Sequence, residues 1–420
     1  MTTVDTHRTI ETVWKIEAPR LIAGLARMLH DVGQAEDLAQ EALVTALERW
    51  PRDGVPDNPG AWLMTTAKRR AIDLMRHQRM RGDKRDALAH ELEAEAMAHA
   101  PDDADALDDD IGDDLLRLIF TACHPVLGRD MQVALTLRML GGLSTPEIAR
   151  AFLVPEATVA QRIVRAKRTL ARKQVPFEVP RGEELAPRLA SVLEVVYLIF
   201  NEGYAATAGD DWARPALCEE AMRLGRVLAG LAPREAEVHA LLALMEIQAS
   251  RLHARTAADG TPILLADQDR SRWDRLLIQR GLAALERAQK LGGADGNYAL
   301  QAAIAACHAR AVHAEDTDWT RMAALYARLA AVTRSPVVEL NRAVAVSMAE
   351  GPEAGLALVD ALRDEHALAR YHLLPSVRGD LLYKLGRYEE ARAEFERAAA
   401  LAGNAREVTF LHERAAACNN

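Results

Sequence analysis

Apolar residues recur along most of this chain with the spacing of an α-helix, and no segment alternates convincingly as a β-strand would. The clearest case is the segment from Ala35 to Trp50, where apolar residues return at intervals of three and four. Alanine and leucine, which lose least on entering a helix, dominate, and only 5% of the residues are aromatic. These features predict an all-α fold.

The chain is long for one hydrophobic core, because 420 residues usually divide into two or three domains. Composition and turn residues suggest a helical domain at 1–80, an acidic linker at 81–114, a second helical domain at 115–175 and a helical extension at 181–420. We expect the linker to be flexible or weakly helical. It serves either as an inert tether or as a mimic of nucleic acid.

The formal net charge of the chain is −9, but the charged residues are distributed unevenly along the sequence. Residues 83–114 hold 13 acidic and 2 basic side chains, whereas residues 115–173 hold 10 basic and 3 acidic ones. One basic cluster lies at 68–81 and another at 162–173. Such clusters are either solvated helix faces or contacts for phosphates.

Two short helices joined by a tight turn are predicted between residues 144 and 173. Ser144 and Glu147 form a capping box that opens a helix to about Phe152, and a second helix should run from 155 or 156 to Lys173. This pattern is typical of a helix-turn-helix. Upstream, Asn58 and Pro59 should start a helix that reaches about His77 and ends in the first basic cluster.

Helices of the extension return at a regular interval. Predicted starts at Asp318, Pro352 and Tyr388 are separated by 34 and 36 residues, a period that fits stacked helical hairpins. The unit at 381–402 is the clearest, with Gly386 at the turn and Ala391 in the close contact. It resembles a tetratricopeptide repeat.

Three strings resemble the extracytoplasmic-function group of bacterial sigma-70 factors. DVGQAEDLAQEAL at 31–43 and NPGAWLMTTAKRRAIDLMR at 58–76 are similar to parts of region 2, and LSTPEIARAFLVPEATVAQRIVRAKRTLARK at 143–173 is similar to region 4. The resemblance implies that the chain is an RNA polymerase sigma factor with core polymerase and promoter DNA as partners. The contacts on the polymerase would be the β′ clamp helices and the β flap.

The resemblance also assigns residues to three surfaces. The polymerase-binding face would comprise Glu36, Asp37, Gln40 and Glu41. The −10 element would be held by Trp62, Lys68, Arg69, Arg70 and Arg76, although Trp62 suits a core position equally well. The bases of the −35 element would be read by residues near the helix start, Thr158, Gln161 and Arg162. Arg165, Lys167 and Arg168, further along the helix, would bind the DNA backbone.

The extension makes the resemblance more specific, because one group of these factors, often called ECF42, carries a C-terminal helical-repeat domain of this size. FNEGYAAT at 200–207 looks like a motif of that group, with Asn201, Glu202 and Tyr204 either capping a helix end or making a functional contact. Membership implies that the extension modulates the sigma factor, by packing on it or by receiving a protein or peptide partner.

An enzyme is not expected, since the chain has no phosphate-binding glycine loop, HExxH motif or nucleophile elbow. Cys123 and His124 are the nearest approach to a catalytic pair, but neighbours on a helix diverge, so a core cysteine and a capping or surface histidine are expected. We therefore expect no catalytic residue, metal or cofactor. The alternative function is a helix-turn-helix regulator that senses a ligand or peptide through its repeats.

Cellular location follows from what the sequence lacks. It has no signal peptide at its N-terminus and no CxxC pair, and its longest apolar stretch, at 190–200, is too short for a bilayer. A cytoplasmic protein without membrane contact is expected.

Overall fold

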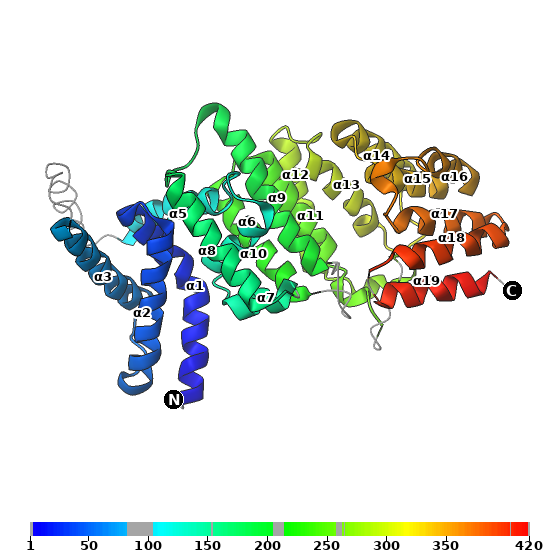
Figure 1. Cartoon of the computed structure of the whole chain (residues 1–420). Coiled ribbons are helices and arrows are strands. Elements are labelled where there is room, and N and C mark those ends of the chain that lie inside the picture. Colours follow the sequence, from blue (N-terminus) through cyan, green and yellow to red (C-terminus); the bar gives the residue numbers. More distant parts are fainter. Residues whose placement is uncertain are drawn as a thin grey trace. The chain divides into compact units, whose positions relative to one another are not determined.

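The computed structural model describes residues 3–81, 104–152, 154–204, 214–257, 263, 265–403 and 405–418. Within these ranges the chain is helical and contains no strand, so the predicted all-α class is confirmed (Figure 1). The chain divides into two compact units, Met1–Val196 and Tyr197–Asn420. The division falls inside a single helix, α9 (Leu185–Tyr204).

The first unit begins with three long helices that pack on one another (Figure 1). They are α1 (Thr3–Leu29), α2 (Val32–Asp53) and α3 (Pro59–Arg81). Asp31 caps α2 by accepting hydrogen bonds from the backbone N–H groups of Gly33 and Gln34 at 2.7 and 3.0 Å. Asn58 caps α3 through the N–H of Ala61 at 3.0 Å, as predicted.

The predicted linker is helical in its last part. Helix α5 (Ala104–Ala122) starts eleven residues before the expected domain boundary at 115 and packs on α1. Asp114 is buried there beside Arg27, at 3.4 Å, and Arg117, at 2.7 Å. These ion pairs explain why an acidic segment without apolar periodicity continues as a helix. The rest of the acidic linker, 82–103, lies outside the described residues.

The helix-turn-helix lies in the same unit and follows α6 (Arg129–Met139). It consists of α7 (Thr145–Phe152) and α8 (Glu156–Arg172), within one or two residues of the predicted bounds. The capping box is formed, because Glu147 accepts from the N–H of Ser144 at 2.8 Å and from its hydroxyl at 2.7 Å. The first turns of α9 also belong here, since Ser191 donates to the carbonyl of Cys123 at 2.9 Å.

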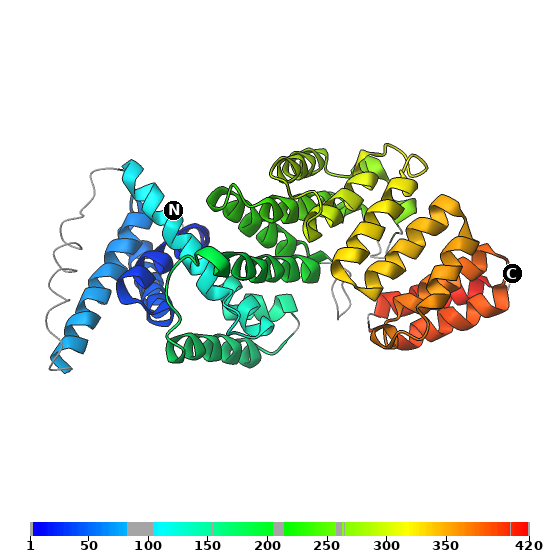
Figure 2. The ribbon, with the colours of Figure 1, turned by 90° about the horizontal axis from the view of Figure 1, so that it is seen from above.

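The second unit is a succession of helices in which each packs on the next, as the green to red part of Figure 2 shows. They are α10 (Pro215–Leu231), α11 (Ala236–Ala249), α12 (Arg275–Lys290), α13 (Asn297–Arg310), α14 (Trp319–Thr333), α15 (Pro336–Glu350), α16 (Pro352–Ala361), α17 (Leu373–Lys384), α18 (Tyr388–Leu401) and α19 (Ala405–Ala417).

The repeat predicted from residue spacing is present. Helices α14, α16 and α18 begin within one residue of the predicted starts, each after a preceding helix and turn. Gly386 turns the chain before α18 with a φ of +73°, which favours glycine. Ala391, Phe395 and Ala398 are buried in the core of the last hairpins, as the helical spacing requires.

Candidate nucleic-acid interface

Helix α8 has one buried and one exposed face. Its apolar side, Val159, Ile163, Ala166 and Leu170, packs into the first unit. The opposite side exposes Gln161, Arg165, Arg168 and Arg172 at helical spacing. Among the described residues, no carboxylate lies within salt-bridge distance of Arg165 or Arg168. The exposed side is therefore a row of cations with a polar amide near its N-terminal end.

Two other predicted −35 residues are less available. Thr158 is half-buried, and Arg162 donates to the Asp130 carboxylate of α6 at 2.6 Å. Asp130 is itself exposed, so this ion pair is a weak one that phosphate can replace.

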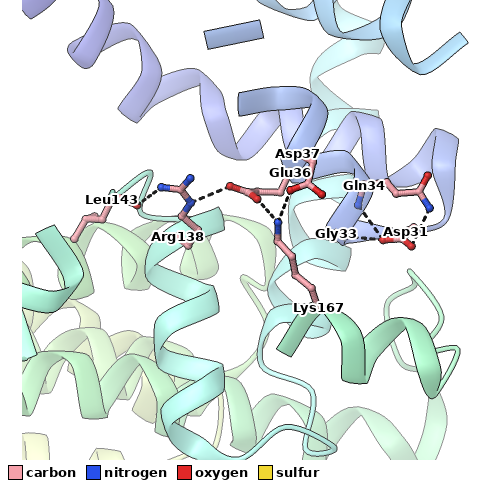
Figure 3. Close-up of polar contacts among 8 residues, drawn as sticks. All are labelled: Asp31, Gly33, Gln34, Glu36, Asp37, Arg138, Leu143 and Lys167. Carbon is pink, nitrogen blue, oxygen red and sulfur yellow. Dashed lines mark hydrogen bonds and ion pairs between the residues drawn. The ribbon is translucent and has the colours of Figure 1, made fainter. Parts of the chain in front are cut away.

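Lys167 does not lie in the exposed row, because its side chain turns toward α2 (Figure 3). Its ammonium donates to Glu36 and, at 2.8 Å, to Asp37. Burial lowers the pKa of this ammonium, but the two carboxylates outweigh burial and hold the pKa above its ordinary value. Arg138 of α6 approaches Glu36 from the other side at 2.9 Å and also donates to the carbonyl of Leu143.

The predicted acidic face of α2 is therefore only partly exposed. Asp37 and Glu41 are exposed and Gln40 is half-buried, but Glu36 retains 3% of its accessible surface. The expectation that Glu36 lies on an open face is wrong in this structure, because α6 and α8 cover it. A single-helix periodicity cannot reveal a second helix that covers a polar position.

Sequence reasoning also missed Arg138. It is the basic residue of the last turn of α6, a helix whose neighbouring positions are buried. An arginine that stands among buried positions of a helix indicates an acidic partner, because a charge removed from solvent must be paired.

Helix α3 presents the other predicted cationic row. Lys68, Arg69 and Arg76 are exposed, and Arg76 has only a distant contact with Asp73, at 3.8 Å. Arg70 instead reaches α2, where it donates to Glu41 at 2.8 Å and to the Thr45 hydroxyl at 2.9 Å. The structure thus joins Arg70, which was assigned to the −10 element, to Glu41, which was assigned to the polymerase-binding face.

Trp62 is half-buried and packs edge-on against Trp50, with 5.4 Å between the ring centroids. Through this contact the Trp62 ring contributes to the core where α2 and α3 meet.

The adjacent Cys123 and His124 serve the fold. The Cys123 thiol is buried 3.4 Å from the Thr136 hydroxyl, and burial raises its pKa to about 11, which disfavours the reactive thiolate. The His124 ring accepts from the N–H of Val126 at 3.1 Å and so caps the turn after α5.

Comparison with known families agrees with this arrangement. Residues 14–81 match the model of sigma-70 region 2, and residues 117–170 match that of sigma-70 region 4. Residues 188–289 match a family of unknown function, DUF6596. One chain therefore carries both a sigma-70 region 2 and a sigma-70 region 4.

Curated relatives fall into two kinds. The "Uncharacterized protein R00370" of Rhizobium meliloti is 45% identical over 94% of this chain and 92% of its own length. The "Probable ECF RNA polymerase sigma factor SigI" of Mycobacterium tuberculosis is 27% identical, over 41% of this chain and 58% of its own length. The "RNA polymerase sigma-H factor" of Pseudomonas aeruginosa is 27% identical over 38% of this chain and 82% of its own length. The chain belongs to one family with the Rhizobium protein, with which it shares nearly its whole length, and its first 170 residues are similar to extracytoplasmic-function RNA polymerase sigma factors.

Across the described ranges, none of the helices has both the length and the apolar character needed to cross a membrane.

Proposed function

We propose that this chain directs core RNA polymerase to a set of promoters through α2, α3 and α8, and that its second unit modulates this activity. The observation that carries the proposal is the pairing of matched regions 2 and 4 with two exposed cationic rows, one on α3 and one on α8. A protein that works with polymerase acts in the cytoplasm.

In this proposal α8 enters the major groove of the −35 element. Gln161 lies near the N-terminal end of the helix, where side chains reach base edges, and Arg165 and Arg168 lie one and two turns further along. The arginines hold phosphates and position the helix. Lys68, Arg69 and Arg76 of α3 contact the backbone of the separated −10 strand in the same way.

Core polymerase binds the acidic side of α2, and this step requires α8 to move away. Asp37 and Glu41 are accessible for docking, whereas Glu36 is covered by Arg138 and Lys167. The β′ subunit would therefore compete with Lys167 for the carboxylates of α2. The described arrangement corresponds to a closed form that precedes engagement.

The second unit is proposed to regulate the factor. Supporting this role, helices α14 to α19 form stacked hairpins, an architecture that offers an extended surface to a protein or peptide partner. We keep the division into a region 2 domain at 1–80, a region 4 domain at 115–175 and a regulatory domain at 181–420, with α9 contacting region 4 at its start.

Transcription by purified core polymerase tests the proposal. Genomic fragments should give discrete new run-off products only when the full chain is added. The double variant Arg165→Ala/Arg168→Ala should lose most of this activity but retain core binding, whereas Arg363→Ala, an exposed arginine of the second unit, should behave as wild type. Sequence-specific duplex binding without polymerase, and no new transcripts, would instead identify a helix-turn-helix regulator.

A further inference from the structure

A cluster of guanidinium groups lies in the second unit and shares no residue with the cationic rows of α3 and α8. Arg251 and Arg255 follow α11, and Arg270 lies in a short 3-10 turn, Arg270–Arg272, that precedes α12. The side chains of Arg255 and Arg270 are nearly excluded from solvent. The cluster falls within the segment that matches a family of unknown function.

Two aromatic rings organise the cluster. The Arg255 guanidinium carbon lies 3.7 Å from the centroid of the Tyr204 ring, and that of Arg270 lies 4.9 Å from the Trp273 ring. Arg251 lies between them, at 5.9 Å from the Tyr204 ring and 5.8 Å from the Trp273 ring. Cation–π contacts offset part of the cost of burying these charges, but they do not neutralise them.

Two of the charges have no carboxylate in direct contact. Within the described part of the chain, no carboxylate lies within salt-bridge distance of Arg251 or Arg270, and the Arg251 guanidinium makes no hydrogen bond. Arg270 donates to the carbonyls of His308 and Ala311, at 2.7 and 2.9 Å, which are neutral groups. Burial, followed by the charge of Arg251, lowers the pKa of Arg270, and the carboxylates of Asp316 and Glu315 oppose this shift only in part.

Buried donors around these charges are also unsatisfied. The Nε atoms of Arg251 and Arg270 and the indole N–H of Trp273 have no partner among the described residues. Trp273 and Arg270 retain 3% and 8% of their accessible surface. A buried donor without an acceptor is costly and rare in native proteins, and three around one cluster indicate a missing acceptor of negative charge.

The cluster has access to a surface cavity. A cavity of about 400 Å³ is lined by Arg270, Gln268, Arg275 and His313, together with Asp269 and Glu315. The Asp269 carboxylate already accepts from the N–H and hydroxyl of Ser271, at 2.9 and 2.6 Å. Arg270 is the arginine of the cluster that lines this cavity, so a ligand would reach the cluster through Arg270.

We propose that the Arg251–Arg270 cluster binds a dianionic phosphate group, carried by a small phosphorylated metabolite. A phosphate supplies two negative charges for the two guanidiniums that no carboxylate contacts directly and several acceptors for the donors without a partner, whereas one carboxylate supplies a single charge. The proposal is independent of the promoter-directing function, because every residue that it uses lies in the second unit.

Thermal unfolding and calorimetry of the full chain with inorganic phosphate test the site. Phosphate should stabilise the wild type saturably, relative to chloride at equal ionic strength. Arg251→Met keeps the aliphatic stem and should bind at least tenfold more weakly, yet it should fold at least as stably without phosphate because it removes a like charge. Arg363→Met, an exposed arginine of the same unit, should bind as the wild type does.

Further ligands identify the source of the phosphate. Tighter binding of a nucleoside monophosphate or of glycerol phosphate than of inorganic phosphate would support a phosphorylated metabolite, whereas preference for inorganic phosphate would overturn that part of the proposal. Absence of saturable stabilisation, or equal binding by Arg251→Met, would overturn the site itself.

Discussion

At the scale of single residues, burial decides what each charge contributes. Glu36 and Asp37 both bind Lys167, but Glu36 is enclosed by two cations and Asp37 is exposed. A buried carboxylate with cationic partners holds its surroundings together, whereas an exposed ion pair contributes little. The two acidic neighbours therefore have different roles despite their shared partner.

This difference predicts the stability of two variants. Glu36→Ala leaves Arg138 and Lys167 facing each other without a carboxylate, and we expect it to lower the free energy of unfolding by about 2–3 kcal/mol. Asp37→Ala should cost less than about 1 kcal/mol. Urea denaturation monitored by circular dichroism measures both. Equal losses would contradict the burial of Glu36.

His308 predicts a pH dependence for the second unit. Burial, with Arg251 and Arg270 nearby, lowers its pKa to about 3 from an ordinary value near 6.5. The unfolded chain therefore binds a proton that the folded chain does not, and stability should fall by about 1.4 kcal/mol for each pH unit below about 6.5. Unfolding followed from pH 7 to 5 tests this, and His308→Gln should show a shallower dependence.

At the scale of elements, most helices follow from the sequence, but their partners do not. The caps at Asn58 and Ser144 and the repeat interval locate the starts of α3, α7 and the later hairpins to within a residue or two, because caps and periodicity are local properties. The predicted end of α3, at about His77, lies four residues before the observed end at Arg81. Lys167, which covers Glu36, lies 131 positions further along the chain, and no local sequence pattern encodes a contact over that separation. The same reason explains why the contact of Ser191 in α9 with the Cys123 carbonyl was not predicted.

Close helix packing in the repeats gives a further prediction. A Cβ at Gly355 of α16 would lie 2.4 Å from the Ser347 Cβ and 2.9 Å from the Ala343 carbonyl oxygen. Gly355→Ala should therefore destabilise the second unit by about 1–3 kcal/mol. Gly230→Ala, in α10, meets no atom within 4 Å and should be neutral or stabilising by up to about 1 kcal/mol. Thermal melts compare the two, and equal effects would refute the packing of α15 on α16.

The cationic row of α8 predicts how promoter binding responds to salt. If polymerase bound to this chain neutralises about five phosphates through α8, log affinity should fall with log salt at a slope near −4 to −5. Removing two phosphate contacts by Arg165→Ala/Arg168→Ala should make the slope less negative by about 2. An unchanged slope in fluorescence-anisotropy titrations would remove these arginines from the interface.

At the scale of the whole molecule, the proposed sigma factor must exchange a closed form for an open one. The acidic side of α2 pairs with Lys167 of α8 (Figure 3) and with Arg70 of α3, so the surfaces proposed to contact polymerase and DNA bind each other. Charge complementarity of this kind lets polymerase and promoter replace internal partners with stronger external ones. Polymerase binding by this mechanism therefore requires α8 to move away from α2.

A reversible disulfide between α2 and α8 tests that dependence most directly. A Cβ at Gly33 would lie 3.5 Å from the Lys167 Cβ, within the range for a disulfide of about 3.5–4.5 Å, and the four native cysteines are buried. Oxidised Gly33→Cys/Lys167→Cys should bind core polymerase at least tenfold more weakly than its reduced form, while Lys167→Cys alone should not respond to oxidant. Equal polymerase binding by the locked and reduced forms would contradict the account.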